Sequence, residues 1–190
     1  MLRVFRSTFA RLNTQASLTS RTHATSTMAS PHPVILCGKT EAIGAVVIEK
    51  LKPELEGTIA RRHMSRISFL LTSYLVVQFI QSVETGKQQI PALLRGEDPG
   101  SSGSTRGSQN YEKTPVAVLL GAAFDNQGIQ ELRDAARGTK DVPWLRPDTT
   151  KPMPPLGPEY GKAIVERIKE TVKGLEERSE LIGNGGVVWF

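Results

Sequence analysis

The residues best suited to binding chemistry lie in one short turn, the stretch Cys-Gly-Lys-Thr-Glu-Ala-Ile-Gly that ends at Gly44. Gly38 follows an apolar run, so the chain can turn tightly there, and a helical pattern begins directly afterwards. The free N–H groups at the start of such a helix favour an anion such as a phosphate. Lys39 and Thr40 could add a charge and a hydroxyl group. The ligand contacts that we expect in this turn are Gly38, Lys39, Thr40, Ile43 and Gly44.

Two further segments carry suitable residues at the ends of expected strands, where open parallel sheets bind their ligands. Gln81 and Ser82 follow the second apolar run, at the position where NAD-binding folds usually carry an Asp or Glu for the ribose hydroxyls. Their residue types argue against strict NAD use and leave NADP, another nucleotide or no ligand. Gly121, Ala122 and Ala123 follow the strongest apolar run, and their small side chains leave room for a flat ring or a ribose.

Each of these patterns also has a plainer structural interpretation. A glycine after a strand often does no more than form a turn, and Lys39 could be a solvated surface charge. The small residues 121–123 could simply let two segments pack closely. The sequence therefore leaves a ligand site and ordinary packing as alternatives.

Catalytic groups cannot be assigned from the sequence. The histidines His23, His32 and His63 lack metal-ligand spacing, and a single cysteine excludes a disulfide framework or a paired-cysteine zinc site. Cys37 falls at the end of an expected buried strand, where cysteine is more often an inert core residue than a nucleophile. We therefore predict no metal site and leave the catalytic residues unknown.

Strand and helix patterns alternate along the chain, which predicts an α/β protein with helices on both faces of a parallel sheet, a three-layer α/β/α sandwich. We expect about four strands and a short C-terminal strand or tail, at 34–37, 76–80, 115–121, 142–145 and 187–190. The helices are expected at 42–52, 82–95, 125–138 and 158–178, with Ser82 and Asp125 as N-caps.

The first 27 residues read as a targeting segment rather than as part of this domain. They carry four arginines and no acid, and Leu2, Phe5, Phe9 and Leu12 share one helical face. An Arg-rich, acid-poor amphipathic start is typical of a mitochondrial transit peptide, which predicts the mitochondrial matrix. The alternative is a misassigned start, with translation beginning at Met28 and the protein in the cytoplasm.

Residues 57–75 interrupt an otherwise compact helix–loop–strand connection. They contain three arginines and no acid, and removing them would join Glu56 directly to the second strand at Val76. We hypothesise that this stretch is a translated intron, the alternative being a genuine insertion. The Gly/Ser-rich loop 96–114 is too polar to pack by its pattern and is expected to be mobile. Residues 28–190 are otherwise expected to form a single domain.

The basic character of the chain comes from these peripheral segments. The formal net charge is +5, but segments 1–27 and 57–75 together hold seven arginines and no acid, so the remainder carries −2. Nucleic acid is therefore not an expected partner. The apolar run 69–80 is too short for a membrane span, which needs about 20 residues. A terminal strand at 187–190 could pair between subunits of a homo-oligomer.

The turn at Gly38 resembles the glycine-rich turn of the short-chain dehydrogenases/reductases, Gly-x-x-x-Gly-x-Gly. Gly38 and Gly44 match its outer positions, and Ala42 replaces the middle glycine. The resemblance implies a Rossmann-like fold, NADP or NAD as cofactor and oxidoreductase-like chemistry. The Tyr-x-x-x-Lys pair of that group is missing, because Tyr160 is followed four residues later by Ile164.

The chain as a whole resembles small fungal proteins of Rossmann-like topology over residues 33–190 without 57–75, a resemblance that implies no activity. Two alternatives stay open beside a nucleotide-binding protein. One is a non-catalytic accessory or interaction protein on the same fold. The other is a flavodoxin-like or receiver-like module, and the receiver option lacks the acidic residues that would end its first and third strands.

Overall fold

A computed structural model describes residues 31–52, 74–101, 103–181 and 183–190. Segment 1–27 and residues 57–73 lie outside these ranges, so the transit-peptide and intron hypotheses stay predictions. The last two residues of the hypothesised intron, Tyr74 and Leu75, are described and open the second strand. Tyr74 is buried and pairs with His32, so the strand begins earlier than its expected start at Val76.

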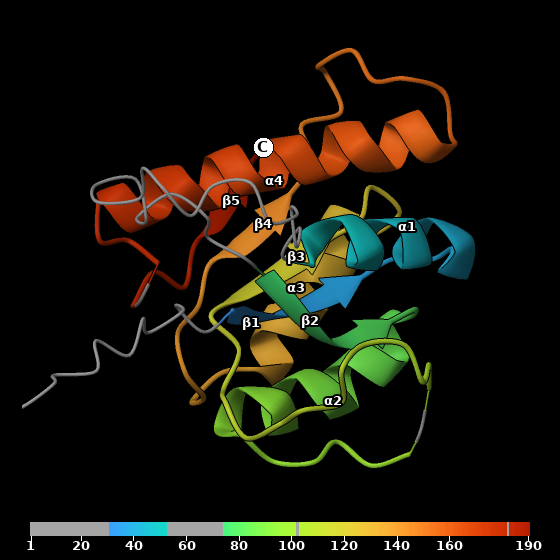
Figure 1. The fold of residues 1–190 in the computed structure, drawn as a ribbon. Helices are drawn as coiled ribbons and strands as arrows, with labels where there is room; N and C mark the ends of the chain where they lie inside the picture. Colours follow the sequence, from blue (N-terminus) through green and yellow to red (C-terminus); the bar gives the residue numbers. More distant parts are fainter. Residues whose placement is uncertain (1–30, 53–73, 102, 182) are drawn as a thin grey trace, which may run out of the picture.

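Five parallel strands form one open sheet in the order β2-β1-β3-β4-β5 (Figure 1). They are β1 (His32–Cys37), β2 (Tyr74–Ile80), β3 (Ala117–Leu120), β4 (Trp144–Arg146) and β5 (Val187–Trp189). The α/β class and the parallel sheet are confirmed. This order is the flavodoxin-like variant of the doubly wound sheet, in which the direction of strand progression reverses between β1 and β3.

The helices cover both faces of the sheet, as expected for a three-layer sandwich. Helices α1 (Glu41–Leu51) and α4 (Pro158–Glu177) pack on one face, and α2 (Val83–Arg95) and α3 (Asn126–Ala135) on the other. Figure 1 shows α1 and α4 above the sheet and α2 below it. Along β1 the buried side chains alternate between the two cores, because successive residues of a strand point to opposite faces.

The N-termini of α2 and α3 are closed by their own side chains, as the sequence predicts. The Ser82 hydroxyl accepts a hydrogen bond from the Thr85 N–H at 3.1 Å. The Asp125 carboxylate accepts one from the Gly128 N–H at 2.7 Å. Each cap satisfies an N–H group that the helix itself leaves without a partner.

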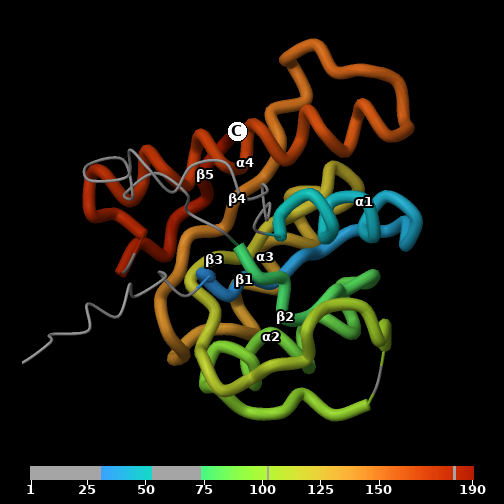
Figure 2. The backbone as a smooth tube through the Cα atoms, viewed as in Figure 1, coloured from blue at the N-terminus to red at the C-terminus, as the bar shows by residue number. Residues whose placement is uncertain are grey.

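The loop that follows α2 packs against the edge of the sheet, contrary to the expectation from its polar composition. We call residues 103–109 the edge strap. The Phe79 N–H donates to the Arg106 carbonyl at 3.1 Å, and the Ser108 N–H donates to the Val76 carbonyl at 2.9 Å. Figure 2 shows this yellow-green segment passing beside β2 and α2 on its way to β3. Backbone hydrogen bonds thus attach this segment to β2, while the expected mobility of loop 96–114 stays a prediction.

A register irregularity in β2 accompanies this pairing. Val34 of β1 pairs with Val76, but the next residue, Ile35, pairs with Gln78, so β2 holds one extra residue. The extra residue keeps Phe79 on the face of α1 and α4. None of the helices within the described ranges combines the length and apolar character needed to cross a membrane.

Candidate functional site

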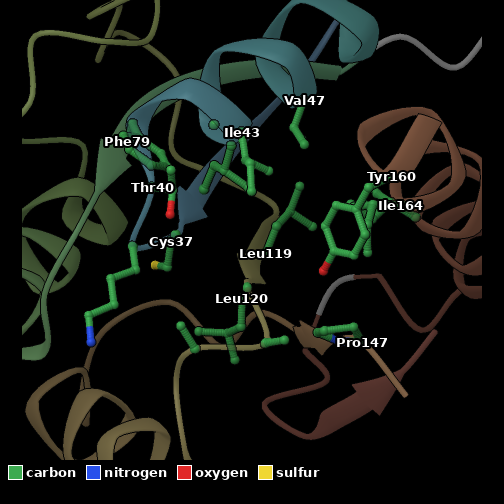
Figure 3. Close-up of a pocket in the computed structure, with 18 of the residues that line it drawn as sticks. Cys37, Thr40, Ile43, Val47, Phe79, Leu119, Leu120, Pro147, Tyr160 and Ile164 are labelled. Carbon is green, nitrogen blue, oxygen red and sulfur yellow. The ribbon is translucent and has the colours of Figure 1, made fainter. Parts of the chain in front are cut away.

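A cavity of about 230 Å³ opens at the carboxyl ends of β1 and β3, between α1 and α4 (Figure 3). This is the point where the strand order reverses, the usual ligand position in doubly wound sheets. Most of the site residues expected from the sequence line it, namely Gly38, Lys39, Thr40, Ile43, Gly44, Gly121, Ala122 and Ala123.

Gln81 and Ser82 lie elsewhere. The Ser82 hydroxyl is engaged as the cap of α2, and Gln81 is exposed beside it. The structure therefore brings the first and third strand ends together around one cavity and leaves the second strand end outside it.

The walls of the cavity are mostly apolar. Leu36 and Leu119 of the sheet line it below the helices, and Val47 of α1 and Ile164 of α4 line its sides. Figure 3 shows the Tyr160 hydroxyl directed into this space. The lining suits a flat or apolar group that makes few polar contacts.

The two outer glycines of the turn are needed for packing around one aromatic ring. A Cβ atom at Gly44 would lie 2.6 Å from the Phe79 ring, and one at Gly38 would lie 3.1 Å from it. Gly121 has a similar role, because its Cβ would lie 3.1 Å from the Cys37 carbonyl, to which its own N–H donates at 2.7 Å. These contacts support the packing interpretation of the three glycines. The same glycines also line the cavity, so this interpretation is compatible with a ligand there.

The helix N-termini beside the cavity differ from those of the other face. The N-cap of α1 is Thr40 and that of α4 is Gly157, and among the described residues no side chain caps either helix. Thr40, and Tyr160 in the first turn of α4, line the cavity. Within the described ranges, two helix N-termini without a side-chain cap therefore border one cavity, and the positive end of each helix dipole favours a negative charge there. At α4, Pro158 supplies no N–H group and Glu159 adds a carboxylate to the first turn.

Glu41 partly offsets this positive field. It is the first residue of α1, where a carboxylate is favoured by the helix dipole. Its carboxylate accepts a hydrogen bond from the Ser104 hydroxyl at 3.1 Å and forms an ion pair with Arg106 at 3.2 Å. Both partners belong to the edge strap, which thus reaches the rim of the site.

Cys37 is fully buried on the cavity floor, and burial raises the pKa of its thiol far above the usual range. The thiol therefore stays protonated and has no nucleophilic character at neutral pH. The buried position of Cys37 at the end of β1 agrees with the expectation from the sequence.

Sequence reasoning did not place several residues that complete the cavity. Tyr160 and Ile164 come from α4, Pro147 and Leu156 from the loop between β4 and α4, and Phe190 from the segment after β5. Leu156 is 74% exposed, the largest exposure among the large apolar side chains of the described residues. In the sequence, Leu156 is recognisable only as an apolar residue in a proline-rich loop. It lines the cavity because α4 packs against α1 and brings this loop to the site.

Comparisons with known proteins give one informative relative. No family model and no solved structure matches the chain. Kojic acid related protein 6 of Aspergillus oryzae is 36% identical over 159 residues, which cover 82% of this chain and 80% of that protein. This supports the resemblance to fungal proteins, whereas the likeness to short-chain dehydrogenases/reductases gains no support. At this identity and coverage, the chain belongs to the family of kojic acid related protein 6.

Proposed function

We propose that this protein binds a nucleotide-class ligand, with a phosphate at the Gly38–Gly44 turn and a ring in the cavity between α1 and α4. NADP and NAD are the cofactors that the sequence suggests. The observation that carries the proposal is the convergence of two uncapped helix N-termini on one cavity at the reversal point of the sheet.

The phosphate half of the proposal rests on backbone donors and one cation. Thr40 and Ile43, at the start of α1, line the cavity, so the first-turn N–H groups of α1 are available to a phosphate there, as in phosphate sites at helix N-termini. Lys39 is exposed and lines the same mouth, so its ammonium group can reach an anion there. Together they offer a phosphate one full positive charge and the partial positive charge of a helix N-terminus.

The ring half rests on size and lining. A volume of about 230 Å³ lies below the roughly 300–1,000 Å³ of common ligand pockets. It suits a single flat ring that packs against the leucine and isoleucine side chains of the wall. The Tyr160 hydroxyl, directed inward in Figure 3, could bond one polar atom of that ring.

The cavity offers few groups for acid–base chemistry by the protein, chiefly the Tyr160 hydroxyl and the Lys39 ammonium group. Among the described residues that line the cavity there is no carboxylate and no imidazole, and the Cys37 thiol is held protonated. Any oxidoreductase-like reaction would therefore use the redox chemistry that a bound nicotinamide cofactor supplies. A non-catalytic ligand-binding or accessory role fits the same residues.

A second candidate ligand is a small oxygenated ring without a phosphate. The relative's name refers to kojic acid, a hydroxypyranone, and a ring of that class matches the single-ring size of the cavity. It would use the cavity and the Tyr160 hydroxyl and would leave the α1 N-terminus free. The two candidates therefore differ in their dependence on Lys39.

Calorimetric titration of the full chain with NADP, NAD and kojic acid tests both candidates. Lys39→Ala should weaken binding of a phosphate-bearing ligand at least about tenfold, since a charge-assisted contact is worth roughly 1.5–3 kcal/mol. The control is Lys50→Ala, which removes an exposed lysine from the last turn of α1, away from the cavity lining. Ala123→Trp, at the cavity mouth, should block every ligand.

The two candidate ligands predict different results for these variants. Loss of binding in Lys39→Ala but not in Lys50→Ala supports the nucleotide. Binding of kojic acid alone, unchanged in Lys39→Ala, supports the second candidate. Saturable binding that Ala123→Trp leaves intact would contradict the assignment of the cavity as the site.

A further inference from the structure

The edge strap lies across the carboxyl end of β2, between the first turns of α2 and α1. On the α2 side, a Cβ at Gly103 would lie 3.2 Å from the Thr85 methyl group. On the α1 side, Ser104 and Arg106 both contact the Glu41 carboxylate. The strap therefore bridges the two helix N-termini that flank the end of β2.

A buried amide fixes the strap in this position. The Gln78 side chain is 3% exposed, and its amide donates to the Ser104 carbonyl at 2.9 Å. Its oxygen accepts a hydrogen bond from the Tyr111 hydroxyl, also at 2.9 Å. Because Ser104 belongs to the strap, moving the strap would leave the buried Gln78 N–H group without this partner, which costs roughly 1–3 kcal/mol.

This position matters for the size of the ligand. In doubly wound folds that bind dinucleotides at the first turn, the second ribose lies beside the end of the second strand. Here that place is next to Gln81 and Ser82, where the strap crosses from Thr85 to Glu41. A dinucleotide at the Gly38 turn would have to share this space with the strap.

We propose that the edge strap fills the place of the adenosine half, so that the site accepts a mononucleotide and disfavours a dinucleotide. This inference rests on the proposed function and names the ligand class more narrowly. Two further features agree with it: the cavity has room for one ring, and Ser82 is already engaged with Thr85 rather than open to a ribose.

Nicotinamide mononucleotide and NAD form a matched pair of probes, because NAD differs from the mononucleotide by its adenosine monophosphate half. The variant Gly107→Val should displace the strap, since a Cβ there would lie 2.5 Å from the Val77 carbonyl and the φ of Gly107 is +118°. Gly100→Val is the control, with a φ of +78° in the same loop and no atom within 4 Å of its Cβ position.

We expect the unchanged protein to bind the mononucleotide about tenfold more tightly than NAD, a difference of about 1.4 kcal/mol. Gly107→Val should strengthen NAD binding about tenfold and leave the mononucleotide affinity unchanged, and Gly100→Val should alter neither. Should Gly107→Val not fold, Tyr111→Phe loosens the strap more mildly and should strengthen NAD binding about threefold.

The failures of the two proposals can be told apart. NAD binding that matches or exceeds mononucleotide binding in the unchanged protein, or that no strap variant alters, would overturn the role of the strap alone. Failure of the unchanged protein and all variants to bind either probe would overturn the phosphate-binding function, and the inference with it.

Discussion

The helices on the two faces of the sheet differ in how their N-termini are capped and in how closely they pack. On the α2/α3 face, each helix N-terminus is capped by its own side chain, and the two helices meet where Gly86 accommodates Leu132. On the α1/α4 face, neither helix has a side-chain cap among the described residues, and a cavity of about 230 Å³ separates their N-terminal turns. The α2/α3 face has capped helix N-termini, whereas in the described part of the chain the α1/α4 face has helix N-termini without side-chain caps and a cavity beside them.

Under the proposed function, the α2/α3 face is structural and the α1/α4 face binds the ligand. Helix N–H groups without caps cost stability, which a bound anion would recover. Close contact on the α1/α4 face is kept at Gly161, whose Cβ would lie 2.5 Å from Val46. The two helices therefore touch at Gly161, one residue after the cavity-lining Tyr160.

The largest contrast should appear in core truncations. Leu132→Ala on the α2/α3 face should cost about 3 kcal/mol of unfolding free energy, because a fully buried leucine leaves a new void. Ile164→Ala at the cavity wall should cost about 1.5 kcal/mol, because that side chain already lacks neighbours on one side. Urea unfolding of both variants measures the difference, and equal losses would mean that the cavity is closed in solution.

A smaller contrast should appear at the caps. Asp125→Ala should lower the unfolding free energy by about 1 kcal/mol, because it removes the hydrogen bond to the Gly128 N–H. Thr40→Ala should change it by no more than a few tenths, since the Thr40 side chain makes no such bond. Chemical unfolding curves compare the two, and a Thr40→Ala loss as large as that of Asp125→Ala would refute the idea of an open N-terminus.

The smallest effect concerns the strap and is set by pH. Burial, and secondly the charge of Asp98, raise the pKa of Tyr111 above its usual 10.0. The neutral phenol is therefore favoured in the folded state, so its stabilisation is complete below pH 10 and is lost as the pH rises through the raised pKa. Unfolding midpoints from pH 8 to 11 should fall more steeply for the unchanged protein than for Tyr111→Phe. Parallel curves would show that Tyr111 titrates normally.

Features that depend on neighbouring residues were predictable from the sequence. Ser82 and Asp125 cap helices as expected, because a cap is decided within four residues of chain. The turn at Gly38 and the small residues after β3 were likewise expected to lie at one site, since parallel strands end at the same edge of a sheet.

Features that depend on distant pairing were not predictable. The order of the strands depends on pairing between distant segments, and the position of Tyr160 depends on how α4 packs against α1. No local pattern encodes either of them. The edge strap was missed for a different reason. Its Gly/Ser-rich composition indicates a loop that does not pack, but its backbone pairs with β2 and its Ser104 carbonyl meets a buried glutamine amide.

Amide hydrogen exchange with and without saturating nicotinamide mononucleotide tests the contrast between the two faces most directly. Exchange should slow at the first-turn amides of α1, Glu41 to Ile43, because the ligand phosphate would take their open N–H groups. The Thr85 and Gly128 amides should not change, because side chains already hold them. Unchanged exchange at Glu41 to Ile43 under saturating ligand would contradict the α1/α4 face as the binding face.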